Sequence, residues 1–153
     1  MRLIPSFKSK GLFTAEESTR IVEAIRKAEQ QTSGELRVFI ESRCRFVDPL
    51  DRASEIFWNL KMDHTAFRNS VLLYVAVRDH QFAIFADIGI HEKLGNQFWQ
   101  NQVNMMSRHF RENHYLEAIL HVINDTGQAL HSYFPYDPNT DKNELPDDIV
   151  FGK

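Results

Sequence analysis

Oxygen-bearing side chains border three segments of the sequence that are predicted to be strands. Glu35 begins the first segment, Asn69 precedes the second, and Asp87 follows the third directly. Carboxylate and amide oxygens are the ligands that hard cations such as Ca²⁺ and Mg²⁺ prefer. The residues around them are of the same small or polar kind, namely Thr32, Ser33, Gly34, Arg68, Ser70 and Gly89. These types and positions suggest a divalent-cation site, provided that the fold brings the three strand ends together.

The elements that position these residues are predicted from the spacing of apolar side chains. Helical spacing predicts four helices, over residues 15–32, 49–62, 96–112 and 115–133. β-branched and apolar runs predict three strands, over residues 35–41, 70–77 and 82–86. Thr14 and Glu17 have the spacing of a capping box, and Asp48 before Pro49 is typical of a helix N-cap. Residues 87–95 are expected to form a loop with one helical turn, and Gly127 within the last helix predicts close packing there.

The lengths of the connections predict how the strands pair. The segment between the first two strands holds a helix, so these strands should be parallel with a right-handed crossover. The connection between 70–77 and 82–86 is too short for a crossover, so this pair should form an antiparallel hairpin. Both of these strands are apolar on both faces, which requires helices on both sides of the sheet. We therefore predict an α/β fold, a three-layer α/β/α sandwich with a small mixed sheet and four helices.

This topology predicts which polar residues meet. The end of the third strand lies beside the beginnings of the first two, so Glu35, Asn69 and Asp87 should share one end of the sheet. The C-terminus of the first helix points its partial negative charge toward the same place, which favours a cation. Two alternatives remain: these residue types are also ordinary turn residues, and ligands of open α/β sheets usually bind beyond the carboxyl ends of parallel strands. That opposite end gathers Glu41, Arg43, Cys44, Asp48 and Asp79.

The histidines and the cysteine are weaker candidates for chemistry. Four histidines of the C-terminal half, His109, His114, His121 and His131, share no regular helix face, which favours solvated or structural roles. Cys44 lies between two arginines, which would favour a reactive thiolate, but the sequence places no catalytic base near it. Because it is the one cysteine of the chain, it also excludes an internal disulfide framework and a cysteine-based zinc site.

The length and the charge distribution predict a single globular domain flanked by an N-terminal arm and an acidic C-terminal tail. The 153 residues are 42% hydrophobic and 25% charged, with a formal net charge of −3. We expect an N-terminal arm over 1–13, a folded domain over 14–134 and an acidic, proline-containing tail over 135–153. The pI near 6.1 argues against a nucleic-acid binder. No apolar run approaches the ~20 residues of a membrane span, and no signal peptide is evident, so we expect a cytoplasmic monomer.

Several stretches together resemble the TPM domain family, named for a thylakoid lumen protein, a photosystem II repair protein and a nematode receptor modulator. The stretches are Ile21 to Ile25, Glu29 to Glu35, Arg68 to Ala76, Phe82 to Lys93, Phe110 to Gly127, Tyr133 to Pro135 and Asn143 to Asp147. The chain is similar to the short, free-standing bacterial form of the family. The resemblance implies a Rossmann-like α/β/α fold, divalent-cation binding, and the acid phosphatase activity attributed to plant members. It implies Asp87 as a metal ligand, and Glu35 and Asn69 follow because the predicted topology places them nearby.

Three functions compete on these grounds. The first is a Ca²⁺ or Mg²⁺ binding module without chemistry of its own, favoured because the sequence has no nucleophile–base signature. The second is a metal-assisted phosphatase in which the cation polarises a phosphoryl oxygen and Arg68 contacts the anion. The third is a scaffold that binds an unknown protein partner through its arm or tail, with Ile149 and Phe151 as an anchor of the tail.

Overall fold

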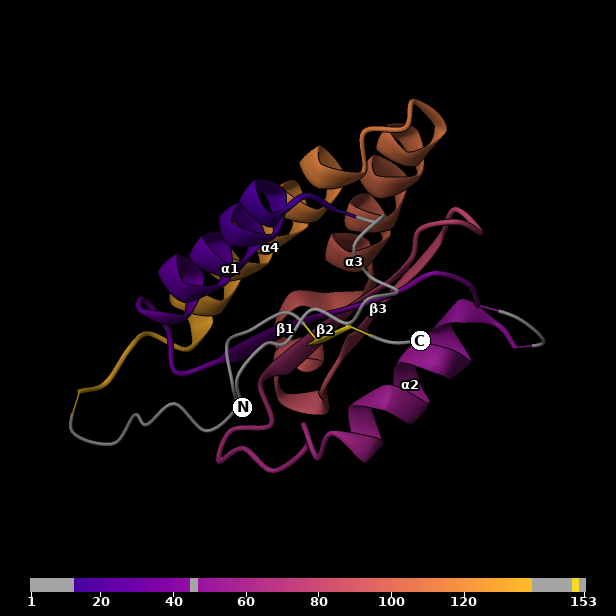
Figure 1. Ribbon diagram of the computed structural model, residues 1–153. Helices are drawn as coiled ribbons and strands as arrows, with labels where there is room; N and C mark the ends of the chain where they lie inside the picture. Colours follow the sequence, from indigo (N-terminus) through magenta and orange to yellow (C-terminus); the bar gives the residue numbers. More distant parts are fainter. Residues whose placement is uncertain (1–12, 45–46, 139–149, 152–153) are drawn as a thin grey trace.

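Capping chemistry sets the first helix boundaries. A computed structural model describes residues 13–44, 47–138 and 150–151 (Figure 1). Thr14 Oγ1 accepts a hydrogen bond from Glu17 N at 3.0 Å, and Thr14 N donates to Glu17 Oε1 at 2.9 Å, which completes the predicted capping box of α1. Asp48 caps α2 through Leu50 N at 2.8 Å, with Pro49 in the first turn as predicted. The helices are α1 (Ala15–Glu29), α2 (Pro49–Asn59), α3 (Ile88–Arg111) and α4 (Tyr115–Tyr133).

The sheet has the predicted mixture of parallel and antiparallel strands. Its strands are β1 (Glu35–Glu41), β2 (Ser70–Ala76), β3 (Gln81–Ala86) and β4 (Val150–Phe151), in the order β3-β2-β1-β4. β1 and β2 are parallel, and β2 and β3 form the expected antiparallel hairpin. β4 adds a short parallel strand on the other side of β1, where Phe151 pairs with Ile40. This strand was not predicted, and Ile149 lies outside the described residues, as do 1–12 of the expected arm.

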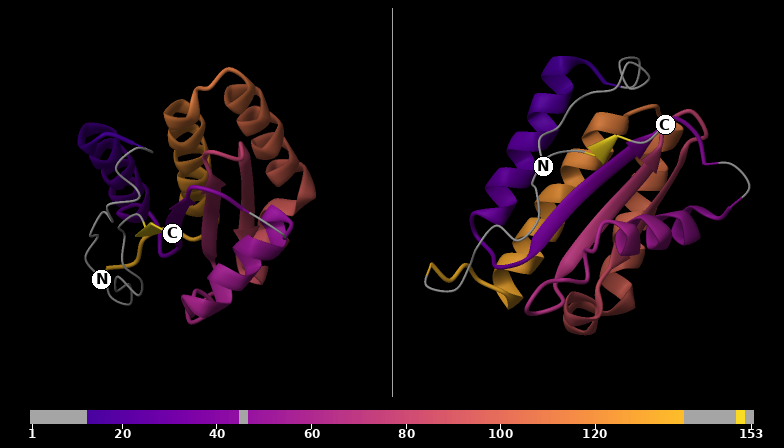
Figure 2. Two further views of the ribbon diagram at one scale, coloured as in Figure 1. Left: turned by 45° about the vertical axis from the view of Figure 1, so that its right-hand side comes forward. Right: turned by 60° about the horizontal axis from the view of Figure 1, so that its bottom comes forward.

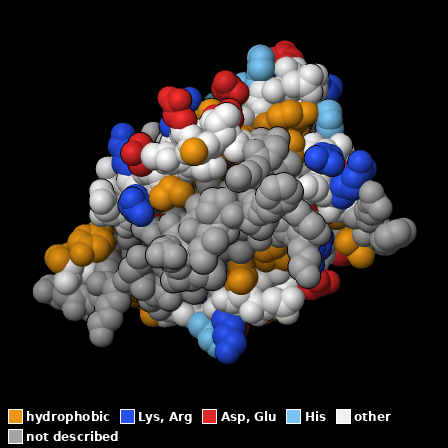
Figure 3. Space-filling model, in the orientation of Figure 1, with side chains coloured by type: hydrophobic (Ala, Val, Ile, Leu, Met, Phe, Trp, Pro, Cys, Tyr) orange, Lys and Arg blue, Asp and Glu red, His pale blue; other side chains and the backbone are white. Residues whose placement is uncertain are grey.

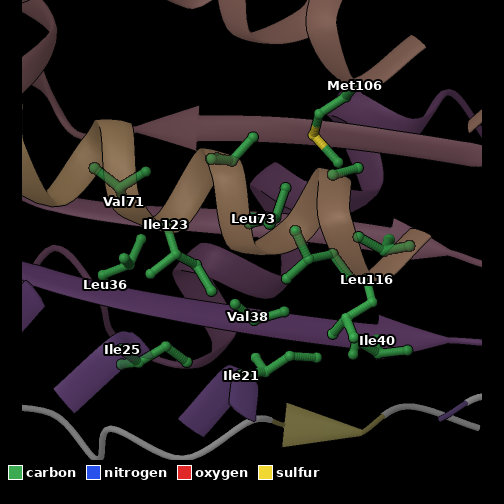
Figure 4. Close-up of a cluster of buried hydrophobic side chains, with 14 of the residues drawn as sticks. Ile21, Ile25, Leu36, Val38, Ile40, Val71, Leu73, Met106, Leu116 and Ile123 are labelled. Atoms are coloured by element: carbon green, nitrogen blue, oxygen red, sulfur yellow. The ribbon is translucent and has the colours of Figure 1, made fainter. Parts of the chain in front are cut away.

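Helices cover both faces of the sheet, which confirms the three-layer α/β/α arrangement. Figures 1 and 2 show α1, α3 and α4 on one face and α2 on the other. Alternate residues of β1 and β2, such as Val38 and Leu73, pack with Ile21 and Ile123 in the larger core (Figure 4). The residues between them face α2, where Tyr74 joins a second cluster of buried side chains. The predicted two-sided burial of β2 therefore holds.

Gly127 allows the parallel helices α1 and α4 to approach closely. A Cβ atom at this position would lie 2.7 Å from the Cβ of Ala28. The predicted reason for a glycine inside α4, close packing, is therefore confirmed. The contact fixes the C-terminal ends of both helices beside the start of β1, at the same end of the sheet as the candidate cation site (Figure 2).

The expectation of a loop over 87–95 is wrong, because a helix begins directly after β3. Asp87 caps it: its Oδ1 accepts from Ile88 N at 2.8 Å, and its backbone oxygen accepts from His91 N at 2.9 Å. The helix runs to Gly95, whose φ of 75° bends the backbone before the rest of α3 continues to Arg111. Two glycines weaken the helical pattern of this segment in the sequence, whereas the cap and the capped first turn stabilise it in the fold.

Candidate functional site

The predicted meeting of three strand ends is present. Glu35 pairs with Ser70 across β1 and β2. Asp87 N donates to Ser70 O at 2.9 Å, which continues the β2–β3 register by one residue. Residues opposite one another on neighbouring strands point to the same face, so Glu35, Ser70 and Asp87 form one row on the face that carries α2. Each is at most 3% exposed.

The spacing of neighbouring strands sets the separation of the two carboxylates in this row. Neighbouring strands lie about 4.8 Å apart, so Glu35 and Asp87 are separated by about 10 Å of backbone with Ser70 between them. Ser70 Oγ is buried and has no hydrogen-bond partner among the described residues. We call Glu35, Ser70 and Asp87 the strand-end row.

Asn69 adds a second buried oxygen beside this row. It is 1% exposed, and its Nδ2 donates to Ser33 Oγ at 3.3 Å. The amide oxygen Oδ1 is buried without a hydrogen-bond partner in the described part of the chain. Asn69 precedes Ser70, so its side chain leaves the backbone toward β1 and not along the strand-end row. The predicted residues are therefore neighbours, but Asn69 occupies a different position from the two carboxylates.

Asp87 is already paired with Arg68. Arg68 Nε lies 2.6 Å from Asp87 Oδ2, and Arg68 Nη2 lies 2.8 Å from Oδ1, a bidentate arrangement. This hydrogen bonding to the carboxylate raises the pKa of Arg68. The carboxylate is 3% exposed, whereas the arginine side chain is 42% exposed. Arg68, predicted as an anion contact, thus contacts the carboxylate of the protein itself.

Gly89 is the residue that brings the loop of Arg68 against the start of α3. Gly89 N donates to Arg68 O at 2.8 Å. A Cβ at Gly89 would lie 2.1 Å from Phe67 O and 2.6 Å from Arg68 O, so no other residue fits this contact without moving the loop. The close approach places Arg68, whose φ is 51°, within reach of Asp87. The pair therefore depends on a glycine two residues after the carboxylate.

Two helix C-termini meet at the same end of the sheet. Ser33 N donates to Phe134 O at 2.9 Å, and Tyr136 N donates to Gln31 O at 3.2 Å. The hydroxyl of Thr32 also donates to Phe134 O. These bonds join the end of α1 to the end of α4, and the C-terminus of each helix carries about half a negative charge. The C-terminus of α4 thus joins that of α1 at this end of the sheet, whereas the N-terminus of α3, capped by Asp87, brings the opposite partial charge to the strand-end row itself.

The opposite end of the sheet contains a pocket of about 310 Å³, lined by Glu41, Arg43, Cys44, Val47, Arg52 and Glu55. Glu41 is 5% exposed and accepts from Arg52 Nε at 3.1 Å, from Arg52 Nη2 at 2.9 Å and from the Tyr74 hydroxyl. Burial, and then the bond to Glu41, raise the pKa of Tyr74 above its usual range. Both carboxylate oxygens of Glu41 therefore have donors within the fold.

The other residues expected at this end have structural contacts. Asp79 accepts from Cys44 N at 2.7 Å and from Arg43 Nη1 at 3.3 Å, and Asp48 caps α2. Arg52 and Tyr74 were not predicted as partners of Glu41. The available signal was that Glu41 and Tyr74 both face α2 from neighbouring strands, two positions apart in register, since Glu41 pairs with Ala76 and Tyr74 pairs with Phe39.

Among residues 13–44, 47–138 and 150–151, no three His, Cys, Asp or Glu side chains are grouped so that they could hold a metal ion. Within the same part of the chain, no helix is long and apolar enough to cross a membrane.

The chain is similar to known proteins over nearly its whole length. The family model of the TPM domain matches residues 6–129. The solution structure of the BA42 protein from the psychrophilic bacterium Bizionia argentinensis is 41% identical, covers 99% of this chain and 100% of its own, and has a TM-score of 0.83. The N-terminal domain of the cg2496 protein from Corynebacterium glutamicum, 12% identical with a TM-score of 0.56 over 98% of this chain and 92% of its own, shares the fold. The comparison with curated proteins found no match. With the family model over most of its length and a 41% identical structure of the same α/β fold, the chain belongs to the TPM domain family.

Proposed function

We propose that the protein is a module that binds a divalent cation, Ca²⁺ or Mg²⁺, at the strand-end row. The observation that carries the proposal is the placement of two buried carboxylates, Glu35 and Asp87, on one face with Ser70 between them. Buried carboxylates in proteins are paired or coordinate metals. Ser70 Oγ, buried without a partner among the described residues, would supply a further oxygen ligand. Asn69, expected as a third ligand from the sequence, is one residue out of phase with the row and is not assigned to it here.

In this proposal, a metal ion that binds Asp87 replaces the positively charged guanidinium of Arg68. Its guanidinium occupies both oxygens of Asp87, so a metal ion has to displace it. Because the arginine side chain is 42% exposed, it can rotate into water with its charge still hydrated. Asp87, at 3% exposure, then gains the metal ion as its replacement partner. Arg68 is therefore expected to lower cation affinity and to keep the carboxylate paired when no cation is present.

The test is a titration of the ¹⁵N-labelled full chain with CaCl₂ and, separately, MgCl₂, followed by NMR. Amide shifts should concentrate in residues 33–36, 68–71 and 86–89. Asp87→Asn should weaken binding at least tenfold, whereas Arg68→Gln should strengthen it by removing the competitor. Asp79→Asn is the matched control, because Asp79 also pairs with an arginine but lies at the other end of the sheet.

Two results would contradict the proposal. One is the absence of saturable shifts at the strand ends with either cation. The other is equal binding by the wild-type chain and the Asp87→Asn variant. An Arg68→Gln variant that binds more weakly would instead contradict the exchange and show that Arg68 supports the site.

A second candidate, metal-assisted phosphatase activity, is favoured by the exposed guanidinium of Arg68 beside Asp87. An arginine displaced by the metal ion becomes available to hold two phosphoryl oxygens while the cation polarises the phosphoryl group. The purified chain should then hydrolyse an aryl phosphate in a Ca²⁺- or Mg²⁺-dependent manner. Asp87→Asn and Arg68→Gln should both abolish hydrolysis, and activity that persists in both variants would place the reaction elsewhere.

A further inference from the structure

Exposed apolar side chains gather at the end of the sheet where β1 and β2 begin. Seven large hydrophobic side chains are exposed in the described part of the chain, and four of them belong to this end, namely Phe67, Ile88, Tyr133 and Tyr136. Phe67 and Ile88 are the two most exposed of the seven, at 56% and 55%. Single exposed apolar side chains are ordinary, whereas a group of them at one place marks a surface that contacts another molecule.

Tertiary contacts bring these side chains together from three segments. Phe67 lies in the loop before β2, and Ile88 lies in the first turn of α3. The two segments touch, because a Cβ atom at Gly89 would lie 2.1 Å from Phe67 O. The ring of Phe67 also lies 6.1 Å, between centroids, from the ring of Phe134 at the end of α4. The segment that holds Phe134 contains both exposed tyrosines, so the end of α4 belongs to the same surface.

Cationic side chains accompany this apolar group. Lys61 is exposed, and the side chains of His64 and Arg68 are 64% and 42% exposed. Asp63 is the acidic residue of this loop, 27% exposed and 3.8 Å from His64 Nε2. Arg68 uses Nε and Nη2 for Asp87, and within the described residues its Nη1 donates no hydrogen bond. Figure 3 shows basic and histidine side chains projecting together at the end of the molecule that carries the loop between α2 and β2.

We infer that this end of the molecule docks onto a bilayer surface that contains anionic phospholipids, with Phe67 and Ile88 among the headgroups and Arg68 on a lipid phosphate. Apolar side chains beside cationic ones are the combination that binds the boundary between headgroups and acyl chains. Guanidinium groups bind phosphate oxygens strongly, and tyrosine side chains favour the same interfacial depth. Glu92 and Lys93, both exposed in α3, offset each other. The cationic loop between α2 and β2 therefore sets the charge that faces the lipid.

A bilayer suits this surface better than a protein partner does. The exposed side chains come from three segments and surround an ion pair, so they form neither one helix face nor one strand edge. Recognition of a protein segment commonly uses a groove or a free strand edge, and the pocket described above lies at the opposite end of the sheet. Lipid molecules can rearrange around single projecting side chains and need no such groove.

The docking is independent of the proposed function. The apolar and cationic side chains reach the bilayer with Arg68 still paired to Asp87, so no metal ion is required. The experiment therefore uses EDTA, which also prevents Ca²⁺ from linking protein and lipid without specificity. Loss of lipid binding and loss of cation binding are then separate results.

The test is the addition of vesicles to the ¹⁵N-labelled full chain in EDTA, followed by NMR and by co-sedimentation. One set of vesicles contains phosphatidylcholine and phosphatidylserine in equal amounts, and the other contains phosphatidylcholine alone. We expect preferential binding to the mixed vesicles, with a spin-labelled lipid broadening the amide signals of residues 66–68 and 87–89. Phe67→Gln and Ile88→Gln should each weaken this binding about tenfold, because each withdraws a large apolar side chain from the bilayer. Lys61→Gln should weaken it about fivefold by removing one cation near the lipid surface.

Leu50→Gln is the matched control. Leu50 is 50% exposed, but it lies in the first turn of α2, away from this end of the sheet. The control variant should bind the mixed vesicles like the wild type. Because the substituted side chains are exposed, the variants should fold, and circular dichroism will establish this.

Several results would overturn the inference. One is a wild-type chain that does not bind the mixed vesicles, or that binds phosphatidylcholine alone equally well. Another is binding by Phe67→Gln and Ile88→Gln that is as tight as that of the wild type, or an equal loss in Leu50→Gln. Shifts of the same amide signals by poly-glutamate, without a response to either kind of vesicle, would make this end a protein-binding surface and would equally overturn it.

Discussion

The buried phenol of Tyr74 should make the folded chain less stable at alkaline pH, and the substitution Tyr74→Phe should remove this pH dependence. Its side chain is fully buried, and its pKa is raised first by burial and then by its hydrogen bond to Glu41. As the pH rises, the unfolded chain loses the phenolic proton near its ordinary pKa of 10.0, while the folded chain retains it. The stability is therefore complete below about pH 10 and falls above it. For one such proton, the loss in the free energy of unfolding is about 1.4 kcal/mol at pH 11 and ~2 kcal/mol at pH 11.5.

The assay compares urea unfolding of the wild type and Tyr74→Phe at pH 7, 9, 10 and 11. At pH 7 the variant should be less stable by about 1.5–3 kcal/mol, because Glu41 loses a donor. This gap should shrink by about 1.4 kcal/mol between pH 9 and 11, since phenylalanine does not titrate. Tyr133→Phe, at a tyrosine that is 49% exposed, is the control and should follow the wild type. A gap that is constant between pH 9 and 11 would refute the reasoning.

Three further predictions concern packing around the strand ends. Gly127→Ala should lower the stability by about 1 kcal/mol, as overpacking against Ala28 exceeds the gain in helix propensity; additive effects with Ala28→Gly in a double-mutant cycle would contradict the contact. Gly89→Ala should lower the melting temperature and shift the amide signals of 67–69, because its Cβ would meet Phe67 O; unchanged signals there would be evidence against it. Removing residues 139–153 deletes β4 and should speed amide exchange at its partner strand β1; unchanged exchange would contradict a stabilising role.

The sequence predicted the meeting of Glu35 and Asp87 because connection lengths decide strand direction. A four-residue link can only return antiparallel, and a link that holds α2 can only cross over. The alternation of side chains along a strand also indicates which face each residue occupies. Ser70 is opposite Glu35, whereas Asn69 is one residue out of phase. A one-residue difference places side chains on opposite faces of a strand. Ser70 is thus the residue that the alternation pattern favours between the two carboxylates.

The partner of Asp87 could not be predicted in the same way. Arg68 is 19 residues away in sequence, and its direction depends on a backbone with positive φ and on the contact of its loop with Gly89. Such contacts depend on tertiary packing and leave no periodic signal. For the same reason, the two-residue strand β4 was not predicted, since Val150 and Phe151 are too few for an alternation pattern.

The two ends of the sheet differ in how their buried carboxylates are satisfied, and this difference supports the proposal that a cation binds at the strand-end row. Glu41 receives donors from both Arg52 and the fully buried Tyr74, so a ligand that displaced them would leave a buried hydroxyl without its acceptor. Asp87 receives its side-chain donors from one arginine, whose side chain is 42% exposed and gains hydration when it leaves, while Asp87 Oδ1 keeps its bond from Ile88 N. Under the proposed function, the usual preference of ligands for the carboxyl ends of parallel strands is outweighed, because the ion pair that would open lies where β1 and β2 begin.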